Sequence, residues 1–575
     1  MTCKYFSLKS LLIISILSMG SSGIIQAQRI LDIDEVQVVA PYEPTISDAY
    51  KINLNPRIDD TISVNLDFDY RIQPLMASTS FEPEPITPAR MRGEPLARLY
   101  RAHLRGGYGN YQTPYFEAFY NSLRNDRYSL GLHLKHKSSG DGVEDYPFSI
   151  YSRNMANIYG TRFFSNTALK ADVMYERDVV HYYGNPGDVA AIAAGDIRQR
   201  YEFLSSGFDF YSLNNGQGSF AYQAGLGHNW LTDRFNGSEH HFTISGKLGS
   251  EIAADPFGLA DKQYFSMDFS GDYFYNTSPA DTSNTGIYAI KPVISSTIDR
   301  LRFHIGVNLG VEDENANYQI RAYPLAGFEM DIIPERMTAI MDLSGGLERN
   351  SWHSLSETNP FVMPSPEMRF SNARTRLSGR LRGSVGDRLS YNFGLTHSRI
   401  DNYPLFGKIY EDTGIQWSMI NDSFNVIYDN IDKLHIHAEL SSEFGRRFSM
   451  RLRGDFFDYS LENQQRAWHQ PDYKLSLNMK YNIQDKIILT ADIFGRGPAY
   501  GPLFLGSTEV DAGNLTEEFK LHDFFIDANA GIEYRYTKRL SVFLNFSNLQ
   551  NESYERWLQY PTHGFNFLGG ISYSF

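Results

Sequence analysis

Two histidines, His435 and His437, are the residues whose types and spacing come closest to those of a metal site. In an extended strand, side chains two positions apart share a face, so both imidazoles would lie on the face that carries Lys433. Glu439 falls on the same face, and imidazole and carboxylate are groups that bind zinc. Lys433 would repel a cation, and the spacing supplies no further ligand. We therefore expect a polar wall here, with no metal and no cofactor.

Catalytic motifs are the second kind of chemistry to consider. His240 and His241 are neighbours, so in a strand their side chains would point to opposite faces. No local motif of a hydrolase surrounds a serine, aspartate or histidine. The one cysteine, Cys3, lies in a segment that looks like a signal peptide, which argues against thiol catalysis and zinc–thiolate sites. We expect the protein not to be an enzyme.

Basic side chains recur on the polar face of several alternating segments. One interpretation is a water-filled lumen in which acidic residues such as Asp455 and Glu533 match these charges. The other is a basic wall that faces an anionic solute or an acidic segment of the chain, because a channel with low-dielectric walls focuses the field of like charges. The candidate lumen-lining residues are Arg376, Arg380, Arg382, Arg451, Arg453, Lys474, Lys480 and Arg535.

The segments that would hold these side chains alternate strictly between apolar and polar residues. Residues 376–385 and 389–396 alternate on either side of the short turn Gly386-Asp387-Arg388, which predicts a hairpin. The last eleven residues place Phe567, Ile571, Tyr573 and Phe575 on one face. A strand with lipid on one side and polar surroundings on the other has this pattern. Tyr573 and Phe575 would form the closing strand's signal for the barrel assembly machinery. Further alternating segments are residues 448–453, 473–482, 532–536 and 540–546.

The whole chain from residue 98 to residue 575 fits an all-β, transmembrane antiparallel barrel of the outer membrane. At the usual length of a strand and its connection, this region predicts about 22 strands, with about 16 to 18 as the alternative. Short turns belong on the periplasmic side of such barrels, and long loops belong outside the cell. The stretches 351–368, 496–517 and 549–563 are therefore expected to be extracellular. A soluble β-sandwich or propeller is the alternative fold.

Two segments precede the barrel. Residues 1–27 have the charged, apolar and small-residue regions of a signal peptide. Residues 28–97 form an arm with many prolines, 12 acidic and 6 basic residues, which is too short to bury a core of its own. We expect the arm to be extended and either periplasmic or partly inside the lumen, with a disordered linker as the alternative. The formal net charge of −14 for the whole chain gives no support to a nucleic-acid partner.

The arm also carries the resemblance to a known family. Residues Asp34, Glu35, Val36, Gln37, Val38 and Val39 resemble the TonB box of TonB-dependent receptors. The longer stretch 36–53, together with Gly93-Glu94-Pro95-Leu96, is similar to TonB-dependent-receptor-like barrels of Bacteroidota. That resemblance implies the barrel fold and a periplasmic partner such as TonB. The receptors place a folded plug between box and barrel, and only about 57 residues lie there in this chain, so a plug of the usual size is not expected.

Two functions follow from these patterns. The first is a channel or transport-related barrel that resembles a plugless TonB-dependent receptor and has outer-membrane lipid around it. The second is a non-transporting barrel subunit of an outer-membrane assembly, whose arm docks a periplasmic protein by adding a strand at Val36–Val39. A surface lipoprotein is a further candidate partner. Transport predicts a continuous aqueous path, whereas the subunit role predicts a lumen closed by side chains and loops.

Overall fold

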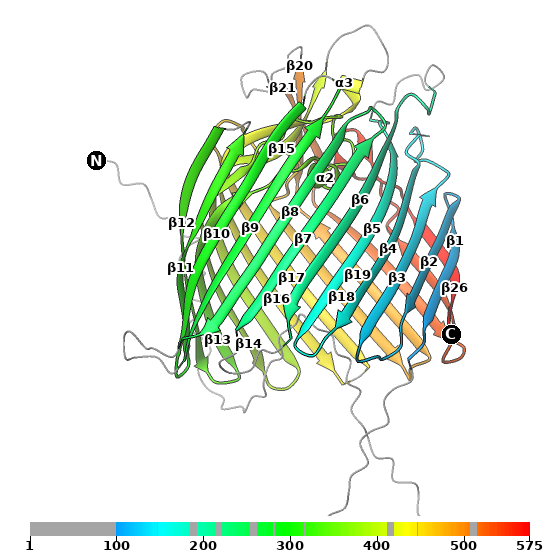
Figure 1. Cartoon of the computed structure of the whole chain (residues 1–575). Helices are drawn as coiled ribbons and strands as arrows, with labels where there is room; N and C mark the ends of the chain where they lie inside the picture. The colour runs from blue at the N-terminus through cyan, green and yellow to red at the C-terminus, as the bar shows by residue number, and fades with distance from the viewer. Residues whose placement is uncertain are drawn as a thin grey trace, which may run out of the picture. The chain divides into compact units, whose positions relative to one another are not determined.

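The computed structural model describes residues 99–146, 148–184, 193–213, 220–252, 262–279, 282–314, 317–410, 419–445, 447–505 and 515–575. These residues form a closed ring of 22 antiparallel strands, so the prediction of about 22 strands is confirmed. Figure 1 shows the strands tilted side by side around the ring. The signal-like segment, the arm and the TonB-box-like residues lie outside the described residues.

The ring takes nineteen consecutive strands and then three more from the end of the chain. In order they are β1 (Ala102–Gly109), β2 (Thr113–Asn121), β3 (Tyr128–Ser139), β4 (Tyr151–Phe163), β5 (Thr167–His181), β6 (Arg198–Ser212), β7 (Ala221–Asp233), β8 (Ser238–Glu251), β9 (Lys262–Thr277), β10 (Thr282–Ile298), β11 (Leu301–Glu314), β12 (Asn317–Ile333), β13 (Met337–Glu348), β14 (Ser371–Val385), β15 (Leu389–Tyr410), β16 (Asn425–Phe444), β17 (Phe448–Leu461), β18 (Tyr473–Ile483), β19 (Ile487–Arg496), β22 (Phe525–Arg535), β23 (Leu540–Ser547) and β26 (Asn566–Ser574).

The alternation in the sequence corresponds to the two faces of the ring. Outward side chains such as Leu226, Ile305 and Ile571 are about 60% exposed, although they are large and apolar (60%, 62% and 58%). In water such a surface would be strongly unfavourable, so its medium is lipid. The inward side chains at alternate positions are mostly polar or charged, as in the predicted hairpin, where Arg376 and Arg380 of β14 alternate with the outward Leu377.

The two ends of the ring differ. At the end that holds Phe575, which we call the turn end, neighbouring strands are joined by connections such as 299–300, 334–336 and 386–388. Gly386 has a φ of +63°, a conformation that glycine adopts without the cost that a Cβ brings. The opposite end, which we call the loop end, carries the long connections 349–370, 497–524 and 548–565.

Short elements within the long connections extend the structure at the loop end. These are the helices α2 (Trp352–Thr358) and α3 (Met419–Asp422) and the strands β20 (Ala499–Leu505), β21 (Leu515–His522), β24 (Glu555–Trp557) and β25 (Tyr560–Pro561). Strands β20 and β21 pair with each other, and β20 also runs parallel to the last residues of β15. Among the described residues, no helix has the length and apolar composition needed to cross a membrane.

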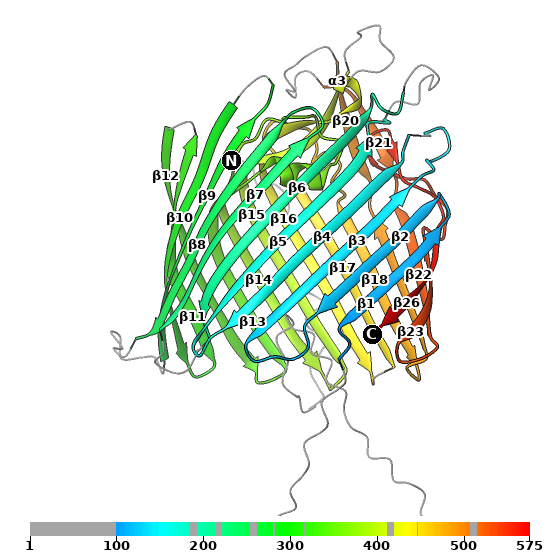
Figure 2. The ribbon, with the colours of Figure 1, turned by 45° about the vertical axis from the view of Figure 1, so that its right-hand side comes forward.

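The ring closes where the C-terminal strand meets the first strand, and Figure 2 shows β1 beside β26 at this seam. On its other side β26 pairs with β23 from Leu540 to Ser547. The backbone N–H groups of Arg101 and Ala102 donate to the carbonyl of Phe575 at 2.9 and 3.0 Å, and the N–H of Phe575 donates to Ala102 at 2.9 Å. Phe575 therefore takes part in the hydrogen bonds that close the barrel.

Candidate functional site: the lumen wall and the loop-end cap

Most of the predicted basic residues on the inward face have an acidic neighbour. Arg376 contacts Glu348 at 2.5 Å, Arg380 contacts Asp342 at 3.5 Å, and Arg382 contacts Glu329 at 2.8 Å. Arg451 and Arg453 both reach Glu439, and Arg453 also contacts Asp455. Arg535 contacts Glu533 at 3.3 Å. The arginine side chains in these pairs remain 40–56% exposed, so each pair contributes about 0 to 1 kcal/mol.

The two predicted lysines differ from these arginines. Lys474 lies opposite Asp455 on one side and opposite Arg496 on the other. Its ammonium group lies 5.4 Å from the centre of the Phe457 ring. Lys480 lies opposite the neutral residues Ser449 and Thr490. The predicted basic residues therefore fall into two groups. The arginines have carboxylate partners, whereas the two lysines form no ion pair with any described residue.

The two histidines of β16 differ in their contacts. His435 Nε2 lies 2.8 Å from Asp455 Oδ1, and its ring stacks on Phe457. His437 lies over Gly394, where a Cβ would meet its ring at 2.1 Å. The described residues contain no group of three or more metal-ligating side chains that could hold an ion. His435 is therefore part of the hydrogen-bonded wall, whereas the buried Nδ1 of His437 has no hydrogen-bond partner among the described residues.

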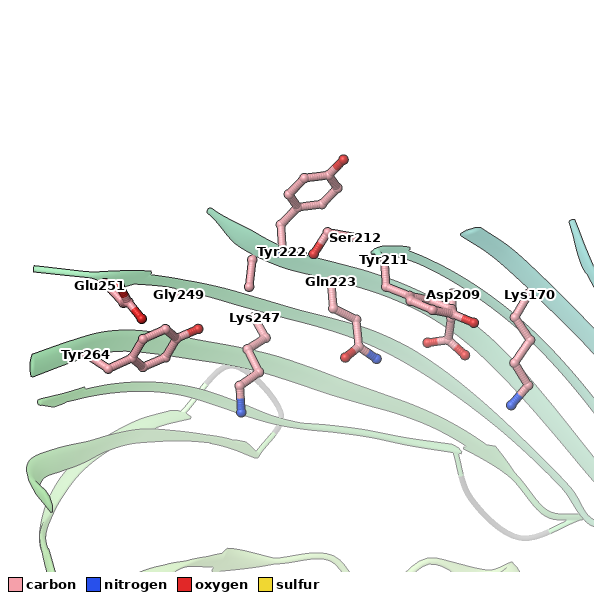
Figure 3. A pocket seen from close by; sticks show the side chains of 11 residues that line it. Lys170, Asp209, Tyr211, Ser212, Tyr222, Gln223, Lys247, Gly249, Glu251 and Tyr264 are labelled. Atoms are coloured by element: carbon pink, nitrogen blue, oxygen red, sulfur yellow. Dashed lines mark hydrogen bonds between the residues drawn. The ribbon is translucent and has the colours of Figure 1, made fainter. Parts of the chain in front are cut away.

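The inward face also has a polar recess near the turn end, on strands β5 to β9. It has a volume of about 710 Å³. Figure 3 shows Lys170, Asp209, Gln223 and Lys247 pointing to the same side of the sheet, with Tyr222 on the opposite side. Lys247 is 3.6 Å from Asp268. The recess offers hydrogen-bond donors and acceptors together, which suits a polar solute or ordered water more than an apolar molecule.

The sequence did not predict the most extensive inward structure, which is an aromatic core inside the ring at the loop end. We call it the loop-end cap. Its buried members come from strands β5 to β7, from β15 and β16, and from the four connections that follow β5, β13, β15 and β23. Figure 1 shows α2 within the outline of the ring near this end. The principal buried residues are Tyr182, Tyr201, Phe203, Leu231, Trp352, Phe361, Phe424, Trp557 and Tyr560.

Hydrogen bonds attach the α2 connection to the wall. The carboxylate of Glu239 in β8 accepts from the backbone N–H of Trp352 at 2.8 Å, and from that of His353 at 3.3 Å. The hydroxyl of Tyr182 donates to the carbonyl of Val362 at 2.9 Å. The Trp352 ring lies so close to Gly237 that a Cβ there would meet it at 2.1 Å. The α2 connection is therefore fixed to β6–β8 by both packing and polar contacts.

A second set of contacts joins the last long connection to β15. Lys408 is 1% exposed, and its ammonium group donates to Gln559 Oε1 at 2.6 Å and to the Gly184 carbonyl at 3.4 Å. The hydroxyl of Tyr560 donates to the carbonyl of Asp422. The Tyr560 ring stacks on Phe361 with centroids 3.9 Å apart. These contacts link segments of the chain that are more than a hundred residues apart.

His469, in the connection after β17, is buried against the cap. It is 2% exposed, and its ring lies 4.9 Å from that of Trp557. Burial, with a smaller contribution from the positive charge of Arg496, lowers the pKa of His469 to about 3. Its imidazole is therefore neutral at ordinary pH.

The positions of the tryptophans are the feature of the sequence that could have predicted the cap. Trp352 and Trp557 fall in stretches that the alternation predicts to be loops, and Trp468 falls in another connection; all three are no more than 5% exposed. A large indole in a long loop of a membrane barrel needs a surface to cover it. The positions of these residues would have predicted loops that fold inward.

Labelling of single cysteines tests which end faces outside. Because the only native cysteine is Cys3, a Ser553→Cys or Asp387→Cys variant adds one exposed thiol at the loop end or the turn end. We expect a membrane-impermeant maleimide to label Cys at 553 on intact cells, and Cys at 387 only after the outer membrane is permeabilised. Labelling of intact cells at 387 and not at 553 would reverse the orientation.

Comparison with known proteins gives likeness at the level of fold. No protein-family model and no curated protein matches the sequence. Among solved structures, the FrpB iron transporter from Neisseria meningitidis (F3-3 variant) matches with a TM-score of 0.62 and 9% identity, over 84% of this chain and 82% of that one. The pyoverdine receptor FpvA from Pseudomonas aeruginosa PAO1 has a TM-score of 0.60 and 11% identity, over 83% and 79%. The copper transporter OprC gives 0.58 and 13%, over 83% and 80%.

The closed ring of 22 strands and its apolar outward face define a multi-pass β-barrel of the outer membrane. Within that class, the chain has the barrel fold of the outer-membrane receptors and transporters named above.

Proposed function

We propose that the protein is a transport-related outer-membrane barrel of the TonB-dependent-receptor type, in which the loop-end cap is the gate. The observation that supports this most directly is the cap itself, because it places a buried aromatic core in the path between the outside and the charged lumen wall. The similar structures include an iron transporter and a copper transporter, so the barrel is of a size that transport uses. Gating would then consist of separating loop segments that now pack together.

We also propose a periplasmic partner. Residues 34–39 resemble a TonB box, and an extended segment with Val36, Val38 and Val39 is suited to pairing with the edge of a partner's sheet. We further propose that the chain has no separate plug domain and that it belongs with the TonB-dependent-receptor-like barrels of Bacteroidota. Both proposals rest on the sequence of the arm.

Binding of purified protein to the C-terminal domain of TonB tests energy-coupled transport. We expect deletion of residues 34–39 to abolish co-purification with that domain. The matched control is deletion of residues 79–84, a segment of the arm that has the same length and also carries two acidic residues. If both deletions leave binding intact, or if the parent protein does not bind the TonB domain, the hypothesis that this segment couples the barrel to TonB is wrong.

The second candidate is a non-transporting barrel subunit. The extent of the cap favours it, since loops from several parts of the ring already fill the loop end without another chain. Gentle purification from native membranes would distinguish the two functions. Stable recovery with periplasmic assembly factors, or with a surface lipoprotein in the absence of solute flux, would favour the subunit role.

A further inference from the structure

Four positive side chains gather where the lumen wall meets the loop-end cap. Lys433 lies in β16, Lys474 at the start of β18, Arg496 at the end of β19, and Arg556 in β24 of the cap. Lys474 and Arg496 are directly opposite each other in neighbouring strands. Like charges in opposed positions destabilise a sheet. The Tyr554 ring stacks on Phe525, which pairs with Arg496, and this contact brings Arg556, two residues further on, to the same end of the wall. The charges of Lys433 and Arg556 also repel that of Lys474, and we call the four residues the cationic cluster.

Acidic side chains do not neutralise the cationic cluster in the way that they neutralise the arginines of the wall. Among the described residues, none of the four makes an ion pair within 4.0 Å. The nearby carboxylates attract Lys433 and Lys474 but have other partners: Glu348 contacts Arg376, and Asp455 contacts Arg453 and His435. The cluster therefore holds excess positive charge near the loop end of a wall in which the arginines of β14 and β17 are paired.

The polar atoms of Arg496 indicate where a ligand would bind. One terminal nitrogen, Nη2, donates to the carbonyl of His469 at 3.1 Å, and this bond fixes the guanidinium beneath the cap. Its Nε atom is buried without a hydrogen-bond partner in the structure. A buried donor without a partner costs about 1–3 kcal/mol, so an acceptor oxygen of a bound ligand or of an ordered water would stabilise this group.

Aromatic rings border the other side of the cluster. The ammonium of Lys433 lies 5.2 Å from the centre of the Phe457 ring and 5.6 Å from that of Tyr459, and Lys474 lies 5.4 Å from Phe457. These rings hold the two ammonium groups on the same side of β17 without removing their charge. The side chains are thus held near one another for a ligand that carries several negative oxygens.

We propose that Lys433, Lys474, Arg496 and Arg556 form a binding site for a multivalent oxyanion, a solute with at least two carboxylate or phosphate charges. The inference deepens the proposed transport function, because it names the class of solute that the wall below the gate selects. The site uses three wall residues and one cap residue, so a bound anion bridges wall and cap. The charge of the bound oxyanion offsets the repulsion between Lys474 and Arg496, and charge-assisted hydrogen bonds to its oxygens stabilise the complex.

Calorimetric titration of the purified full-length protein tests the site, with inorganic pyrophosphate as one probe and propane-1,2,3-tricarboxylate as the other. We expect Lys474→Met to weaken binding of the preferred probe about tenfold, as loss of a hydrogen bond to a charged group does. Lys474→Arg should keep most of the affinity. The matched control is Lys480→Met, which removes the same charge from the same face of β18, six residues nearer the turn end. It should change affinity by less than about twofold, because exposed charges are screened beyond about 10 Å in moderate salt.

The two probes distinguish phosphate from carboxylate as the preferred group. Equal losses in Lys474→Met and Lys480→Met would mean that only the general field of the lumen attracts anions, and would overturn the proposed site. So would a parent protein that binds neither probe. Heat-modifiable migration of each variant on gels shows that the barrel is folded. Anion binding that persists in a protein with no affinity for TonB would leave this site standing while energy-coupled transport fails.

Discussion

Deletion of Tyr573, Ser574 and Phe575 is expected to leave the secreted chain unassembled. Phe575 exchanges backbone hydrogen bonds with Ala102, and Tyr573 pairs with Leu104 on one side and Leu540 on the other. Without these residues β26 loses the turn-end part of its pairing with both neighbours. In lipid, unpaired backbone groups are costly, so the seam of an open ring is strongly disfavoured. The outer-membrane fraction should show almost no heat-modifiable barrel, and the chain should be degraded in the periplasm.

A Ser574→Ala variant is the control for this deletion, because it keeps the backbone and both aromatic side chains. It loses only the contact between His103 Nδ1 and Ser574 Oγ at 2.9 Å. We expect normal amounts of barrel from it. Normal assembly of the deletion variant would show that neither the aromatic end nor the seam bonds are required for closure.

Replacement of Trp352 and Tyr560 by alanine is expected to raise the conductance of the protein in planar bilayers several-fold. Both side chains are no more than 2% exposed at the centre of the loop-end cap. Removal of a buried aromatic side chain costs about 3–5 kcal/mol, which is enough to separate loops that are not part of the hydrogen-bonded ring. The cap should then open while the barrel persists. Single-channel recording of parent and variant measures the change.

Outward aromatic residues provide the matched control for the cap variant. Trp230 and Tyr534 face lipid and are 39% and 46% exposed. The double substitution Trp230→Ala and Tyr534→Ala removes the same side chains without touching the cap, so its conductance should equal that of the parent. If the cap variant conducts no more than this control although it is folded, then the cap is not the gate, and the role of a closed barrel subunit gains support.

Period-two alternation was sufficient to predict most of the barrel. Residues 376–385 and 389–396 form the predicted hairpin in β14 and β15, and the final residues form β26 with Phe567, Ile571 and Tyr573 outward. Alternation is reliable here because lipid and a polar lumen lie on opposite sides of each strand, so a shift of one residue would reverse every side chain. Strand number followed from the length of the chain divided by the usual repeat.

The contacts of the site depend on information that alternation does not contain. Arg382 is paired with Glu329, 53 positions earlier and two strands away, so the pair follows only from the register of several hairpins. The cationic cluster likewise needs the register that puts Lys474 opposite Arg496, and the position of Arg556 in the cap. Loop sequences have no period, so the inward fold of the connections is determined by tertiary packing around Trp352 and Trp557.

The loop-end cap has a consequence for the order of folding. Its contacts join Tyr182 to Val362, Lys408 to Gly184 and Tyr560 to Asp422, which are separated by 180, 224 and 138 positions in the chain. Contacts between such distant segments cost loop-closure entropy until the intervening strands have paired, so the cap should be a late product of maturation. A barrel caught before that step would already be inserted in the bilayer but still leaky. The interval between insertion and cap formation would then be a period in which the cell is vulnerable to molecules that the mature protein keeps out.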